Sequence, residues 1–203
     1  TGSMLDNVIY YNVTLPKKYF ARELLNEMLD AAGEAVSLRD DQVFFHHLIV
    51  QRKMIPLPVF LEHASPEDCE RAVISLGYCI KNNAAGNIFN RDLDGRNYGV
   101  GSHTRVYLFD YDALEAFTEV KIRSNSERDD GEEDIPDWYF EDGVIFLPEE
   151  IEWGLRISDP KLRNLFRMKH GDLTRVDYWE RIQEELREGM VPQIQVYPDS
   201  CRL

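Results

Sequence analysis

The sequence predicts an α+β fold in which helices predominate, and three observations support this class. The chain has 203 residues, 43% of them hydrophobic, which is enough to bury a core. Apolar residues recur at helical spacing in several segments that begin at a proline or end at a glycine. Two pairs of short runs rich in β-branched and aromatic residues surround polar turns, as in β-hairpins.

Composition excludes several classes of protein. With 37 acidic against 23 basic residues the formal net charge is -14, which opposes broad binding to nucleic acid or to an anionic membrane. No apolar run approaches the roughly 18 residues that span a bilayer, and no secretory signal precedes the first elements. Cys69, Cys79 and Cys201 form no CxxC pair, which favours a reducing cytoplasm. Residues 1–3 resemble a cloning scar, so we expect the native residues to begin at Met4.

The first 52 residues predict a helix followed by a hairpin. Residues 17–32 place apolar side chains on one helical face, and Gly33 follows as a stop. The runs EAVSL and QVFFHHLIV flank the polar turn 39–41 and read as two strands. In the next segment, QRKMIPLP, Pro56 and Pro58 oppose continued sheet or helix, so we expect an irregular connector.

The central part predicts one long helix and a second hairpin. Ser65-Pro66-Glu67 is a strong helix start, and the helix should run to about Gly86. We expect its inward face to consist of Cys69, Val73, Leu76, Ile80 and Ala84. Residues 87–97 look irregular, and 98–100 and 106–109 read as strands around a Gly-Ser-His-Thr turn.

The last part predicts further helices after an acidic loop. Residues 124–142 are acidic and punctuated by glycine and proline, which indicates a surface loop, although the aromatic residues 138–140 should dock part of it. Pro148-Glu149-Glu150 should open a helix, and helices are expected at about 159–169 and 175–189. We expect Glu149 or Glu150 to pair with an arginine such as Arg163 or Arg175.

The stretch NRDLDGRN, residues 90–97, carries more hydrogen-bonding groups than a turn needs. Its pattern Arg-Asp-Leu-x-x-x-Asn, from Arg91 to Asn97, reproduces all but the first residue of the protein-kinase catalytic loop. Asp110 ends the following strand, where kinases keep a metal-binding aspartate. Each residue alone would be an ordinary turn former, but independent turn residues have no reason to fall in this order.

Phosphoryl transfer requires carboxylate and amide side chains such as those of Asp92, Asn97 and Asp110. One carboxylate accepts or orients the proton of the nucleophile, while an amide oxygen and a second carboxylate hold Mg²⁺ against the phosphate oxygens. Asp92, Asn97 and Asp110 supply these groups, and Asp112 is a candidate for a further metal ligand or a base for water.

Longer blocks resemble the C-terminal third of the bacterial isocitrate dehydrogenase kinase/phosphatase family, from about Tyr10 to Val191. They include NAAGNIFNRDLDGRNYGV, RVYLFDYDALEAFTEV, QRKMIPLPVFLE and HGDLTRVDYWERIQEELREGMV. The resemblance implies a protein-kinase-like fold, with 1–52 as a remnant of the N-terminal lobe and 53–203 as the C-lobe. It also implies Mg-ATP-dependent phosphorylation of a serine of isocitrate dehydrogenase in the cytoplasm and removal of that phosphate, with an AMP-type effector of the intact protein.

The resemblance also implies roles for individual residues. Asp92 is expected to be the catalytic aspartate, with Asn97 and Asp110 as metal ligands. Asp112 corresponds to a carboxylate implicated in the phosphatase direction. Residues 52–57 should lie at the adenine-binding hinge, where Arg52, Met54 and Leu57 are the expected nucleotide contacts.

A kinase also needs a glycine-rich loop and a lysine from its N-terminal lobe. Gly2 and Gly33 are the only glycines before residue 51, so we expect this chain to hold only the end of that lobe, without the family's N-terminal regulatory region, and to be inactive alone. Two alternatives remain: a small-molecule phosphotransferase lobe of the aminoglycoside or choline kinase type, and a non-catalytic kinase-like interaction module.

Overall fold

A computed structural model describes Met4 and residues 7–125 and 143–190 of the chain. The described residues fall into two compact units, divided between Arg52 and Lys53, with Met4 belonging to the second unit. The acidic segment 126–142, with its predicted docking aromatics, and residues 191–203 lie outside the described part.

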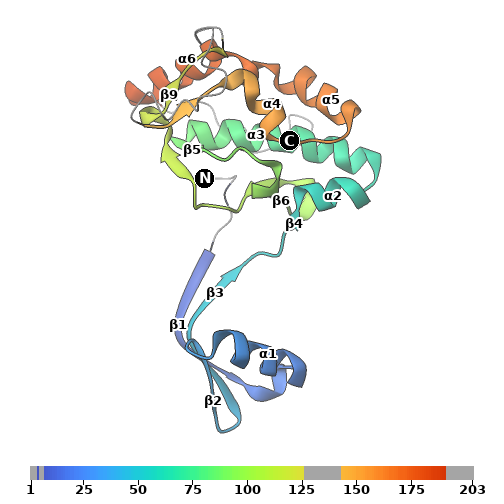
Figure 1. The fold of residues 1–203 in the computed structure, drawn as a ribbon, viewed down its shortest axis with the longest axis vertical. Coiled ribbons are helices and arrows are strands. Elements are labelled where there is room, and N and C mark those ends of the chain that lie inside the picture. The colour runs from blue at the N-terminus through green and yellow to red at the C-terminus, as the bar shows by residue number, and fades with distance from the viewer. Residues whose placement is uncertain (1–3, 5–6, 126–142, 191–203) are drawn as a thin grey trace, which may run out of the picture. The chain divides into compact units, whose positions relative to one another are not determined.

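The first unit is a three-stranded antiparallel sheet with one α-helix, drawn in blue to cyan in Figure 1. Its elements are β1 (Asn7–Pro16), the 3₁₀ helix η1 (Lys17–Tyr19), α1 (Arg22–Ala32), β2 (Val36–Arg39) and β3 (Gln42–Gln51), with the strands in the order β1-β3-β2. The small core consists of Leu25, Val36, Val43 and Phe45. The predicted helix and hairpin are therefore present.

Strand β1 was not foreseen. Its residues 8–11, Val-Ile-Tyr-Tyr, are consecutively apolar and all exposed, so they lack the alternation that marks a half-buried strand. Asn12 also interrupts the extended backbone with a φ of 55°. Pairing with β3 on both sides of Asn12, from Asn7↔Gln51 to Tyr11↔His47 and from Val13↔Phe45 to Pro16↔Gln42, holds β1 in place.

The second unit contains the remaining helices and several small sheets. Its elements are β4 (Ile55–Pro56), α2 (Leu57–His63), α3 (Pro66–Ala85), β5 (Ile88–Asn90), η2 (Gly95–Asn97), β6 (Tyr98–Val100), η3 (Ser102–Thr104), β7 (Val106–Leu108), β8 (Leu114–Ala116), η4 (Phe117–Glu119), β9 (Lys121–Ile122), β10 (Ile145–Phe146), η7 (Pro148–Glu150), α4 (Ile151–Gly154), α5 (Pro160–His170), η8 (Gly171–Thr174) and α6 (Val176–Arg187). This mixture of helices and small sheets confirms the α+β class.

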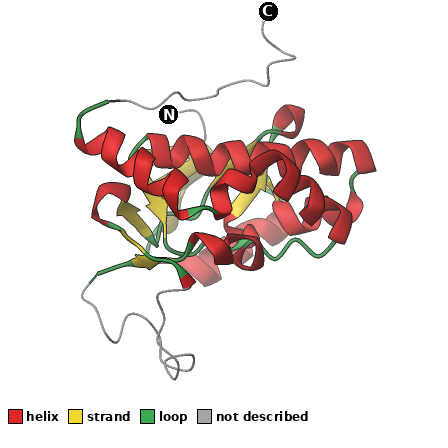
Figure 2. Ribbon diagram, turned by 90° about the horizontal axis from the view of Figure 1, so that it is seen from above, coloured by secondary structure: helices red, strands yellow, loops and turns green. Residues whose placement is uncertain are grey.

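Helix α3 lies at the centre of the second unit. Figure 1 shows it between the strands β5 and β6 and the helices α4, α5 and α6, and these helices lie in front in the view of Figure 2. The five residues predicted to face inward are all buried in the main core, together with Phe117, Phe166 and Trp179. The helical period of the sequence therefore predicted the core face of α3.

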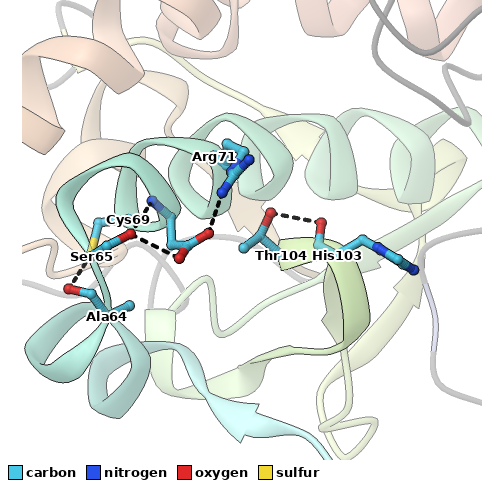
Figure 3. A network of polar contacts seen from close by, with 7 residues as sticks. Ala64, Ser65, Cys69, Arg71, His103 and Thr104 are labelled. Atoms are coloured by element: carbon cyan, nitrogen blue, oxygen red, sulfur yellow. Dashed lines mark hydrogen bonds and ion pairs between the residues drawn. The ribbon is translucent and has the colours of Figure 1, made fainter.

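The start of α3 follows the predicted chemistry, as Figure 3 shows. The Ser65 hydroxyl accepts a hydrogen bond from the Asp68 backbone N–H at 3.2 Å and donates to the Asp68 carboxylate at 2.8 Å. Arg71 pairs with the same carboxylate, and the Cys69 thiol donates to the carbonyl oxygen of Ala64. Because the Asp68 N–H has no partner inside the helix, its bond to the Ser65 hydroxyl caps α3, which begins at Pro66.

Two predicted irregular segments contain regular structure. Pro58 lies in the first turn of α2, where a missing N–H breaks no helical bond, so the expected connector after Gln51 is a short strand and a helix. Within 87–97, β5 pairs with β8 and η2 precedes β6. No helix of the described residues combines the length and the apolar character needed to cross a membrane.

Candidate active site

Two loops of the second unit face each other between two pairs of strands. One loop joins β5 to β6 and contains residues 91–97, and the other joins β7 to β8 and contains residues 109–113. β5 pairs with β8, and β6 pairs with β7, both antiparallel. The loops are also bonded at both ends, from the Arg91 N–H to the Ala113 carbonyl at 2.9 Å and from the Phe109 N–H to the Asn97 carbonyl at 3.1 Å. The topology therefore brings Asp92 and Asn97 to the same place as Asp110 and Asp112.

Two asparagine side chains hold the backbone of Asp92. Its N–H donates to Oδ1 of Asn90 at 3.1 Å, and its carbonyl oxygen accepts from Nδ2 of Asn97 at 2.9 Å. Both asparagines are buried, whereas the Asp92 side chain is exposed. The main chain of Asp92 is thus fixed while its carboxylate remains available to a substrate.

The second loop contains a turn stabilised by an aspartate. Oδ1 of Asp110 accepts a hydrogen bond from the Asp112 backbone N–H at 3.1 Å. This bond links the two aspartates across Tyr111, whose hydroxyl donates to the Leu108 carbonyl at 3.4 Å. Asp110 is half-buried and Asp112 is exposed, so the two carboxylates differ in their access to water.

Asp94 is the buried carboxylate of the first loop. Its side chain is 4% exposed and forms ion pairs with Arg96 at 2.8 Å and Arg156 at 3.2 Å. Burial opposes its ionisation, but the hydrogen bonds from Arg96 and the charges of Arg96 and Arg156 outweigh it and hold the pKa of this carboxyl below its usual range. Asp94 therefore stays ionised near neutral pH.

A cavity of about 490 Å³ opens beside the first loop. Asp92 lines it together with the basic side chains of Arg91 and Arg156 and the acidic side chain of Glu150. Trp153 also lines the cavity, and at 83% exposure it is the most exposed of the large hydrophobic side chains that the structure describes. A side chain entering this cavity would come within reach of the Asp92 carboxylate.

The donor atoms suit a magnesium ion. Nδ2 of Asn97 is used in the bond to Asp92, which leaves Oδ1 as a ligand, and Asp110 adds a carboxylate. Mg²⁺ is usually bound through one or two protein carboxylates, with phosphate oxygens and water as the other ligands. No group of three or more histidine, cysteine, aspartate or glutamate side chains capable of holding a metal occurs among the described residues.

The three residues predicted to bind nucleotide have different surroundings. Met54 lies against β6, because a Cβ added at Gly99 would be 2.7 Å from the Met54 Cβ. Leu57 is 1% exposed and belongs to the main core. Arg52 is exposed and ends the first unit. The structure therefore brings Met54 and Leu57 into one unit, and the role of all three in nucleotide binding stays a prediction.

The contacts of Glu149 differ from its predicted pairing with an arginine. Glu149 accepts from the Ser124 hydroxyl at 2.7 Å and from the Asn125 N–H at 3.4 Å. Arg163 instead donates to the carbonyls of Ile157 and Ser158, and Arg175 pairs with Asp177. Glu149 therefore contacts the residues that follow β9, and an arginine partner for Glu150 stays a prediction.

Sequence reasoning missed two residues of the site. Asn90 stands in the predicted stretch, but its contact with the Asp92 backbone depends on β5, which was not foreseen. Arg156 comes from the residues that follow α4, and no spacing in the sequence connects it with Asp94. Only the fold brings Asp94 and Arg156 together.

Comparison with known proteins identifies the family. The profile of the isocitrate dehydrogenase kinase/phosphatase (AceK) kinase domain matches residues 1–199. Isocitrate dehydrogenase kinase/phosphatases of Rhodopseudomonas palustris strains BisB5, HaA2 and CGA009 are 53%, 50% and 52% identical to this chain over 202 residues. Each match covers 100% of this chain but 32% of the relative. The resemblance seen in the sequence is confirmed, and the chain belongs to the isocitrate dehydrogenase kinase/phosphatase (AceK) kinase domain family.

Proposed function

We propose that this chain is the C-terminal catalytic lobe of a cytoplasmic isocitrate dehydrogenase kinase/phosphatase. In this proposal the second unit is a protein-kinase-like C-lobe, and the first unit belongs to the end of the N-terminal lobe. The facing loops carry the argument, because they bring Asp92, Asn97 and Asp110 together in the order that phosphoryl transfer requires.

In the kinase direction Asp92 is the proton acceptor. The acceptor serine enters the cavity beside Asp92, and its hydroxyl gives its proton to the carboxylate while the oxygen bonds to the γ-phosphorus of ATP. The bond from that phosphorus to the bridging oxygen breaks, and ADP leaves. The asparagine contacts hold the Asp92 backbone, so the carboxylate needs little reorganisation during the step.

Asn97 and Asp110 are the residues that would hold Mg²⁺. When bound, the ion neutralises charge on the phosphate oxygens. In the phosphatase direction we assign Asp112 as the base: it takes a proton from water, the water oxygen bonds to phosphorus, and the bond to the serine oxygen breaks. Protonated Asp92 returns a proton to that oxygen, so serine and phosphate are the products.

The test uses the full-length polypeptide that contains this chain. We expect Asp92→Ala to abolish transfer of labelled phosphate from Mg-ATP to isocitrate dehydrogenase, with a loss of at least about 1,000-fold, and to leave the melting temperature unchanged. Asp177→Ala is the matched control, because Asp177 lies exposed in the first turn of α6 and pairs with Arg175, the residue before the helix. Retention of wild-type turnover by Asp92→Ala would overturn the proposal. Transfer to choline or an aminoglycoside instead would indicate the small-molecule class.

A further inference from the structure

The first loop lies along the end of α4 through three adjacent contacts. A Cβ added at Gly154 would lie 3.6 Å from the Leu93 carbonyl oxygen, and one added at Gly95 would lie 2.5 Å from the Leu155 carbonyl oxygen. Between these contacts, Oδ2 of Asp94 lies 3.2 Å from Nε of Arg156. Residues 93–95 therefore run beside residues 154–156, and a side chain at Gly95 would push the two segments apart.

Asp94 is the polar centre of this contact. Its Oδ1 accepts from the Arg96 backbone N–H at 2.8 Å, and its Oδ2 accepts from the Arg96 guanidinium at 2.8 Å. Arg156, on the other segment, approaches the same Oδ2. A buried carboxylate is costly unless its oxygens are paired, and these charge-assisted bonds fix its direction as well as its charge.

Asp94 is also connected to two of the residues assigned to the reaction, Asn97 and Asp92. Its backbone carbonyl accepts from the Asn97 N–H at 3.0 Å, and it caps η2, which ends at Asn97. The Asn97 side chain in turn donates to the Asp92 carbonyl. A shift of Asp94 away from Arg156 would therefore be transmitted to Asn97 and, through it, to Asp92.

We propose that Asp94 is a positioning residue, which docks the 91–97 loop on Arg156 and so sets the placement of Asp92 and Asn97 for phosphoryl transfer. This inference rests on the proposed function and adds to it a residue whose buried carboxylate pairs with Arg96 and Arg156. Arg156 is its partner, and Gly95 permits the close approach to Leu155.

The experiment has two arms. In the first, the turnover of the full-length polypeptide is measured for Asp94→Asn, Arg156→Gln, their double variant and Arg156→Lys. We expect Asp94→Asn and Arg156→Gln to lower kcat by about tenfold or more with KM for ATP within about threefold, because misplacement of the reacting groups slows the chemical step. The double variant should be no worse than the poorer single one, and Arg156→Lys should recover part of kcat because it keeps the charge.

The second arm needs no activity. In the nitrogen-15 spectrum of the polypeptide, the side-chain amide signals of Asn97 should shift in Asp94→Asn and in Arg156→Gln. They should stay in place in Asp177→Asn, which removes the same charge from an ion pair that is 65% exposed on both sides. If wild type transfers no phosphate, the proposed function fails, and this arm alone decides the positioning role.

Unmoved Asn97 signals, or a kcat within twofold of wild type in both single variants, would overturn the inference. A loss of kcat that follows only a lowered melting temperature, and that disappears on cooling, would overturn it as well. Should Asp94→Asn fail to fold, the two Arg156 variants carry the test, since the Arg156 side chain is 68% exposed.

Discussion

His170 is a fully buried histidine whose surroundings keep it neutral. Its Nε2 lies 2.9 Å from the Ile74 carbonyl, so the neutral ring donates there. Within the described part of the chain Nδ1 is buried without a hydrogen-bond partner, so a second proton would have no acceptor. Burial, followed by the charge of Lys81, lowers the pKa of His170 from 6.5 to about 4.

The fold should therefore lose stability in weak acid. Between pH 6.5 and about 4 the unfolded chain binds a proton that the folded chain does not, so the free energy of unfolding falls as the pH drops through this window. We expect a loss of roughly 1.4 kcal/mol per pH unit from this residue, measured by urea unfolding at several pH values. His170→Gln should remove this part of the slope, whereas the exposed His63→Gln should not. An unchanged slope in His170→Gln would show that other groups cause it.

Sequence order indicated candidate site residues but not the contacts that support them. Asp92, Asn97 and Asp110 were proposed because their order along the chain is itself the signal, and the loops that hold them face each other. Arg156, the partner of Asp94, and Asn90, which holds the Asp92 backbone, were missed because their contacts follow no order along the chain. The contact of Asp94 with Arg156 joins segments about 60 residues apart, so no local pattern encodes it.

At the scale of elements, those with a local sequence pattern could be predicted, and those that depend on contacts with distant segments could not. Helix α3 was predictable because its cap, its proline and its apolar period agree. Strands β5 and β8 have only three residues each, too few for a period to appear, and they exist because they pair with each other. Helix α2 was missed because Pro58 was read as a break, although it lies in the first turn.

The packing of α3 against α5 depends on a glycine. A Cβ added at Gly77 would lie 2.1 Å from Cδ2 of His170, a ring that also contacts Tyr78 and Phe166. Because the ring is fully buried, it cannot move aside without losing its bond to Ile74. The glycine therefore sets how closely the two helices approach.

We expect Gly77→Ala to lower the free energy of unfolding by about 2–3 kcal/mol, as overpacked cores do. Gly171→Ala is the matched control, since a Cβ there meets nothing within 4 Å. Thermal unfolding followed by circular dichroism compares the two variants. Equal melting temperatures would show that the core accommodates the methyl group.

At the scale of the whole molecule, the first unit exposes many apolar side chains for its size. Val8, Ile9, Tyr10 and Tyr11 on β1, and Ile49 and Val50 on β3, are each at least 46% exposed. Strand β2 pairs with β3 only from Gln42 to Phe45, so residues 47–51 of β3 have β1 as their strand partner in the described sheet. Large exposed apolar surfaces commonly mark contacts with other protein surfaces. This agrees with the proposal that the unit belongs to a larger lobe.

The chain alone should bind Mg-ATP weakly and transfer no measurable phosphate. It spans 32% of the length of the relatives it matches, and its sequence before residue 51 has no glycine-rich loop to cover the phosphates. In the proposed function the facing loops supply the groups for chemistry, but without such a cover we expect water to reach the transferred phosphoryl group. Calorimetric titration with Mg-ATP and a phosphate-transfer assay, run side by side on the chain and on the full-length polypeptide, measure the difference. We expect turnover only in the full-length polypeptide. Equal rates of phosphate transfer in both proteins would mean that the second unit positions ATP without help from a second lobe.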